Sequence, residues 1–69
     1  MKISYKAARV NAGLSGDKAS EALGIHRETL YNYEKGKHKP NSQTLVDMAK
    51  LYGCSVEDFR EVNNESEVE

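Results

Sequence analysis

The ten residues from His26 to Lys35 are rich in side chains that donate or accept hydrogen bonds. Arg27, Glu28, Tyr31, Asn32 and Lys35 are spaced i, i+1, i+4, i+5 and i+8, which on a helix places them on or near one outward stripe. Ile25, Leu30 and Tyr33 are spaced to face the opposite side. The segment is therefore predicted to be a helix with a buried side and a hydrogen-bonding exterior.

Glycines and capping residues divide the rest of the chain into short helices, and no alternating strand pattern is present. Five helices are predicted, which begin near Ser4, Ser15, His26 or Arg27, Asn41 or Ser42, and Ser55; the first four end at Gly13, Gly24, Gly36 and Gly53. Their inner faces are predicted to be Tyr5, Ala8 and Ala12; Ala19, Ala22 and Leu23; Ile25, Leu30 and Tyr33; Leu45, Met48, Ala49 and Leu51; and Val56 and Phe59. The predicted class is all-α, with one domain over residues 1–60 and an acidic, flexible tail over residues 61–69.

The formal net charge of −1 argues against a nucleic-acid partner, but the charge is unevenly distributed. Residues 1–56 hold nine Lys and Arg against five Asp and Glu, whereas residues 57–69 hold six acids and Arg60. Lys35, Lys37 and Lys39 lie within five residues, with His38 among them. Such a run is either a solvated loop or part of a basic patch that contacts nucleic acid.

Other chemistry has little support in the residues. The single cysteine, Cys54, cannot form an internal disulfide, and the spacings of 12 and 16 residues among His26, His38 and Cys54 match no zinc pattern. No activated nucleophile, paired acid or glycine-rich phosphate loop stands out, so no catalysis, metal or cofactor is predicted. Neither a signal peptide nor a long apolar run is visible, which predicts a cytoplasmic protein with no membrane partner.

Two short helices joined by a glycine turn, the second with polar residues outward, can place one helix in a DNA major groove, although a structural αα-hairpin has the same pattern. Over residues 5–59 the chain also resembles the phage repressor and Cro family of helix-turn-helix regulators, the lambda-repressor-like or xenobiotic-response-element family. The motifs that carry the resemblance are Arg9, GLS at 13–15, LGI at 23–25, YEKGK at 33–37, Pro40, LxxxAKLYG at 45–53 and SVEDF at 55–59.

The resemblance implies a five-helix domain whose third helix contacts DNA bases, at positions that correspond to His26, Arg27, Glu28, Tyr31 and Asn32. The side chains suit this role, since Arg27 can donate two hydrogen bonds to guanine, Glu28 can accept from cytosine, and Asn32 can pair with adenine. Tyr31 would touch a thymine methyl or a phosphate. Glu28 has an alternative role as the ion-pair partner of Arg27 or of a neighbouring lysine.

The resemblance also implies backbone-phosphate contacts, at Ser15, Gly16, Lys35, Lys37, His38 and Lys39. The family often has glutamine where this chain has Gly16, so the side-chain contact with phosphate is lost here and only a backbone contact could remain. Arg9 and Glu34 match a pair that in this family forms an inner salt bridge between the first and third helices.

The predicted function is a sequence-specific transcriptional regulator that represses by binding double-stranded DNA, as a homodimer on a palindromic operator. Val56, Phe59 and Val62 are the candidate dimer interface, although Phe59 could equally belong to the core. The alternative is a protein-interaction module, such as an antitoxin or antirepressor, that keeps the helix-turn-helix fold. In that case the acidic tail is the candidate contact with a protein partner.

Overall fold

The computed structural model describes residues 2–59, which form four α-helices and one turn of 3-10 helix. The elements are α1 (Tyr5–Asn11), α2 (Gly16–Leu23), α3 (Arg27–Lys35), α4 (Ser42–Tyr52) and the 3-10 turn η1 (Val56–Asp58). The all-α class is confirmed, because the only extended pairing within residues 2–59 is an isolated bridge between Ile3 and Phe59. The helix count differs slightly from the predicted five, since the short fifth helix is the single 3-10 turn η1. The predicted tail lies outside the described residues, and so does Val62.

Side-chain caps fix where three of the helices begin. Ser4, Ser15 and Asn41 each accept a hydrogen bond from the backbone N–H three residues later, at 3.1, 3.1 and 2.8 Å. These bonds satisfy donors that the first turn of a helix leaves unpaired. At the other ends, α2, α3 and α4 are each followed by a glycine in the left-handed conformation. The predicted beginnings and ends of these helices are therefore confirmed to within two residues.

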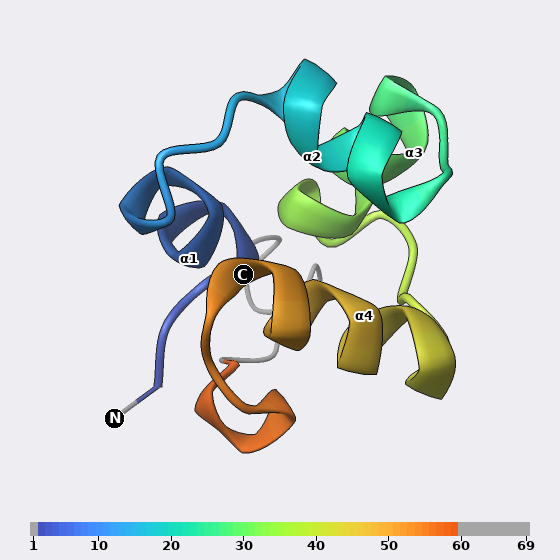
Figure 1. Cartoon of the computed structure of the whole chain (residues 1–69). Helices are drawn as coiled ribbons and strands as arrows, with labels where there is room; N and C mark the ends of the chain where they lie inside the picture. The colour runs from blue at the N-terminus through green and yellow to red at the C-terminus, as the bar shows by residue number, and fades with distance from the viewer. Residues whose placement is uncertain (1, 60–69) are drawn as a thin grey trace.

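The four helices enclose one small core. Figure 1 shows α2 and α3 together, with α4 lying across beneath them and α1 to one side. Leu30 of α3 and Met48 of α4 are fully buried at the centre. Phe59 lies edge-on to Tyr5 and Tyr52, with ring centroids 5.0 and 6.4 Å apart. This aromatic cluster joins the segment after α4 to the first helix.

The inner face of α1 differs from the prediction. Ala12 is exposed because the helix ends at Asn11, whereas Arg9 is buried beside Tyr5. An arginine is rarely buried without a partner, and its partner lies on α3, as described below.

The inner face of α2 also differs. Ala22 is exposed, and Ser20 is buried next to Ala19. Ser20 can be buried because its hydroxyl donates a hydrogen bond to the carbonyl oxygen of Asp17, at 3.1 Å. Hydrophobic spacing alone favours the alanine, since it takes no account of a hydroxyl that finds a backbone partner.

The segment after α4 is inward at only one of its two predicted positions. Phe59 is 7% exposed, but Val56 is 38% exposed and does not belong to the core. A single 3-10 turn is too short to present a continuous apolar face, which explains the difference. Ser55 and Asp58 form a capping box, in which the Ser55 N–H donates to the Asp58 carboxylate at 3.1 Å, and the hydrogen bonds with Ser55 hold the pKa of Asp58 below its ordinary value.

Candidate nucleic-acid interface

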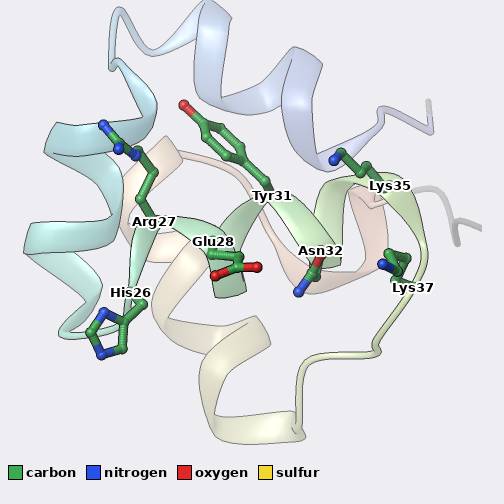
Figure 2. Close-up of a pocket in the computed structure, with 7 residues that line it drawn as sticks. All are labelled: His26, Arg27, Glu28, Tyr31, Asn32, Lys35 and Lys37. Atoms are coloured by element: carbon green, nitrogen blue, oxygen red, sulfur yellow. The ribbon is translucent and has the colours of Figure 1, made fainter.

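The outward side of α3 forms one wall of an open hollow of about 620 Å³, shown in Figure 2. We call its lining the α3 face; it consists of His26, Arg27, Glu28, Tyr31, Asn32, Lys35 and Lys37. All five predicted base-contacting residues are brought together here, with two of the predicted phosphate contacts. His26 is the N-cap residue of α3, but its side chain makes no capping hydrogen bond. Its imidazole is exposed at one end of the α3 face.

The orientation of α3 is fixed from its buried side. Leu30 is completely buried against the core, which turns the opposite stripe outward. Arg9 of α1 donates to Glu34 of α3 through Nε, at 2.7 Å, and through Nη2, at 3.3 Å. Its Nη1 donates to the carbonyl oxygen of Leu14, at 3.0 Å. The structure thus joins the two residues that the resemblance paired, and it ties α1, α3 and the α1–α2 connection together.

The Arg9–Glu34 pair is almost dry. The two side chains are 9% and 6% exposed. The hydrogen bond to Glu34 raises the pKa of Arg9 above its ordinary value, although burial acts in the opposite direction. Charged groups this far from water depend on each other for compensation.

Arg27, at the start of α3, is joined to α2 rather than to its own helix. Its Nη1 lies 2.7 Å from Oδ1 of Asp17, and the two side chains are 60% and 69% exposed. This hydrogen bond raises the pKa of Arg27, so the guanidinium stays charged. The alternative in which Glu28 pairs with Arg27 is not found, and Glu28 has no ion pair anywhere in residues 2–59.

Tyr31 projects from the middle of α3 towards the start of α2, where Gly16 is buried (Figure 2). A Cβ atom at position 16 would lie 2.6 Å from Cζ and 2.8 Å from Cε1 of Tyr31, which is too close for any real contact. The missing side chain at Gly16 therefore makes room for the tyrosine ring. The departure from the family's usual glutamine and the tyrosine on α3 are sterically linked.

The predicted phosphate-contacting residues do not all line one hollow. Lys35 and Lys37 line the α3 face, and a hydrogen bond of 2.9 Å from the Lys37 N–H to the Asn32 carbonyl keeps Lys37 against the end of α3. His38 and Lys39 instead line a separate hollow of about 90 Å³, which is also bounded by tyrosines of α1 and α3. Ser15 and Gly16 lie at the start of α2, where Ser15 is occupied as the cap and Gly16 is covered by the Tyr31 ring.

Sequence reasoning missed two residues near the α3 face. A further hollow of about 340 Å³ is lined by Lys6, Arg9, Tyr31, Glu34 and Lys35, and it shares two of these with the α3 face. Lys6 therefore extends the basic surface onto α1. Asp17, in the first turn of α2, was not among the predicted site residues. The contact of Asp17 with Arg27 depends on how α2 and α3 cross, which residue spacing does not reveal. For Lys6 a signal was present, since its i, i+3 spacing from Arg9 could have placed both residues on one side of α1.

Neither a metal-binding cluster nor a membrane-spanning helix is found within residues 2–59. No group of three or more His, Cys, Asp or Glu side chains there is arranged to hold a metal ion. None of the helices in this part of the chain has the length and apolar character needed to cross a membrane.

A family model described as helix-turn-helix matches residues 6–59, nearly the whole of the described chain. The chain belongs to the helix-turn-helix family of the phage repressor and Cro type. Members of this family are DNA-binding transcriptional regulators.

Curated relatives of the chain come from archaea and bacteria. It is 33% identical over 59 residues to an uncharacterized HTH-type transcriptional regulator of Methanocaldococcus jannaschii, covering 86% of this chain and 89% of that protein. It is 36% identical over 52 residues to the HTH-type transcriptional regulator ImmR of Bacillus subtilis, covering 75% and 41%. It is 31% identical over 48 residues to the cryptic phage CTXphi transcriptional repressor RstR of Vibrio cholerae, covering 70% and 43%. The chain thus spans less than half the length of ImmR and RstR, and no solved structure matches it significantly.

Proposed function

We propose that this helix-turn-helix protein is a sequence-specific DNA-binding transcriptional regulator, which represses by placing α3 in the major groove of a palindromic operator. The observation that carries the proposal is the α3 face, where all five candidate base-contacting side chains line one open hollow (Figure 2). The names of relatives agree with it, since RstR is a phage transcriptional repressor and ImmR a transcriptional regulator.

Three side chains of the α3 face offer different hydrogen-bond patterns to base edges. Arg27 presents donors that suit O6 and N7 of guanine, Asn32 presents a donor and an acceptor that suit adenine, and Glu28 accepts from N4 of cytosine. Each well-formed bidentate contact discriminates against a wrong base by about 1–3 kcal/mol. Because Glu28 has no ion pair within residues 2–59, its carboxylate is available for such a contact.

The surroundings of the α3 face suit contacts with backbone phosphates. Lys35 and Lys37 lie at one end, and Lys6 extends the positive surface onto α1. Tyr31 projects towards the start of α2, so its hydroxyl is placed to donate to a phosphate in place of the side chain that Gly16 lacks. Ser15, His38 and Lys39 remain candidate contacts further out. These interactions fix the register on DNA and make the affinity fall steeply with salt concentration.

Binding as a homodimer would supply the contact area that one small domain lacks. Two copies of α3 would then lie about 34 Å apart, one helical turn of DNA. Of the candidate interface residues, Phe59 is used in the core against Tyr5 and Tyr52, whereas Val56 is 38% exposed and remains available.

The test is selection of binding sites from random duplex DNA at two salt concentrations. We expect the wild-type protein to enrich a palindrome, with binding weakened at the higher salt. Arg27→Ala should lose the preference at one position in each half-site, at a cost of about 1–3 kcal/mol per contact. Lys50→Ala is the matched control, because it removes an exposed positive charge from α4, away from the α3 face.

Other outcomes would redirect the search. Base recognition is contradicted if no DNA sequence is enriched either by the wild-type protein or by a variant truncated after Val62, which lacks the acidic residues that follow. A protein-interaction module, contacting its partner through the acidic segment, would then be the better description. If Arg27→Ala and Lys50→Ala weaken binding equally on every sequence, the protein binds DNA without base contacts from Arg27.

A further inference from the structure

We propose that Asp17, on α2, is a positioning residue that sets the guanine preference of Arg27 by holding its guanidinium in one orientation. The proposal rests on the function proposed above and adds a specificity determinant outside the recognition helix.

Within residues 2–59, the edge of the Arg27 guanidinium that carries Nε and Nη2 has no hydrogen-bond partner. Asp17 Oδ1 accepts from Nη1 alone, at 2.7 Å. Two adjacent donors in one plane are what O6 and N7 of guanine require. Asp17 can therefore keep its hydrogen bond while Arg27 contacts the base.

The position of Asp17 is fixed by the start of α2. It occupies the first turn of α2, two residues after the Ser15 cap, where the helix dipole favours a carboxylate. The packing of α2 fixes this turn relative to α3, since Ala19 is completely buried and the Tyr31 ring fills the space beside Gly16. The carboxylate is thus presented to Arg27 by rigid elements.

The Asp17–Arg27 pair contributes little to the free energy of folding, because both side chains are more than half exposed and exposed ion pairs are weak. Its effect on DNA binding is different in kind. A free arginine side chain loses rotamer freedom when it docks on a base, and an existing partner removes part of that cost in advance. The same partner restrains Arg27 from turning to other bases or to phosphates, which penalises sequences without guanine at this position.

Removal of the carboxylate should therefore separate affinity from specificity. Asp17→Ala loses a negative charge near the DNA, so affinity for unrelated duplex should rise. The preference for guanine at the Arg27 position should fall by about two- to fivefold per half-site, the scale expected for an exposed pair. A residue with only a structural role would change neither preference nor charge-dependent binding in this opposed way.

The experiment measures the affinity of the full chain for four versions of its selected operator, which differ only at the position whose preference Arg27→Ala abolishes. Asp47→Ala is the matched control, since Asp47 is an exposed carboxylate on α4 with a single side-chain hydrogen bond, to Gln43. Thermal melting of each variant verifies that folding is retained. We expect only Asp17→Ala to flatten the guanine preference.

An unchanged preference in Asp17→Ala, with a uniform rise in affinity for all four operators, would overturn the proposal and leave Asp17 as a simple source of repulsion. Equal flattening by Asp47→Ala would overturn it as well, because a general charge effect would then suffice. If the wild-type protein selects no operator, the proposed function has failed and the role of Asp17 fails with it.

Discussion

Replacing Arg9 with methionine is expected to destabilise the domain severely, because the change leaves a buried carboxylate without its partner. Arg9 donates two hydrogen bonds to Glu34 and one to the carbonyl oxygen of Leu14. The Glu34 side chain is 6% exposed, so water cannot take the place of the guanidinium. Methionine keeps a long apolar stem but supplies no donor.

The expected magnitude is large compared with the stability of so small a domain. Breaking a buried pair by removing one partner costs about 3–5 kcal/mol. A chain of 69 residues has a total free energy of unfolding of about 3–10 kcal/mol, at roughly 0.05–0.15 kcal/mol per residue. The double variant Arg9→Met, Glu34→Met removes the stranded charge together with its partner, and such apolar replacement is often close to neutral. The double variant should therefore recover most of the stability that the single variant loses. A deficit of about 1 kcal/mol should remain, because the Leu14 carbonyl is still unpaired.

Urea denaturation followed by circular dichroism, at neutral pH, gives the free energy of unfolding of the wild type, the single variant and the double variant. We expect the order wild type, double variant, single variant, from most to least stable. A loss below about 1 kcal/mol in Arg9→Met would refute the reasoning, because that is the scale of an exposed pair. A double variant no more stable than the single one would refute it too.

Two further substitutions test other contacts. Tyr52→Phe should stabilise the protein by about 1–3 kcal/mol in urea denaturation at pH 7, because the Tyr52 hydroxyl is buried without a hydrogen-bond partner in residues 2–59. Burial and the charge of Glu34 raise the pKa of Tyr52 from 10.0 to about 12. As the pH rises from 10 towards 12, Tyr52 therefore loses its proton first in the unfolded state, and the free energy of unfolding falls. The Tyr52→Phe variant lacks this part of the fall. Gly16→Ala should displace the Tyr31 ring and weaken operator binding by about 1 kcal/mol per half-site, the net value of one hydrogen bond, with no loss of helix content.

Each of these has a control. Tyr33→Phe is the matched control for loss of a tyrosine hydroxyl, because it removes the hydroxyl of a half-buried tyrosine outside the aromatic cluster. A Tyr52→Phe variant less stable than the wild type would show that the hydroxyl has a favourable partner. Gly16→Ala should cost nothing further when Tyr31 is already alanine; an additional loss would mean that position 16 acts independently of the ring.

Local signals in the sequence were sufficient to predict the four α-helices. Ser4, Ser15 and Asn41 cap three of them through bonds to neighbouring backbone, and these interactions span only three residues. Apolar spacing likewise placed Leu30 and Met48 in the core, because a helix repeats its faces at a fixed period. The same period grouped Arg27, Glu28, Tyr31, Asn32 and Lys35 on the α3 face, whereas the resemblance supplied His26 and Lys37.

The burial of polar side chains could not be predicted in this way. The burial of Arg9 depends on Glu34, 25 residues away in sequence. The burial of Ser20 instead of Ala22 depends on a hydroxyl finding a carbonyl within its own turn, a choice that an apolar pattern does not represent. The resemblance to a family supplied the first of these pairs, whereas the residues alone did not.

The sequence by itself determined an all-α chain of short capped helices and the set of polar side chains that one of them turns outward. Only the tertiary structure decided that Arg27 is held by Asp17 and that Tyr31 lies in the space left by Gly16. Both contacts join α2 to α3, and they depend on the distance and crossing of the two helices. That crossing is set by packing around Ala19 and Leu30, which involves the whole core at once, whereas caps and periodicity act within a few residues of one helix.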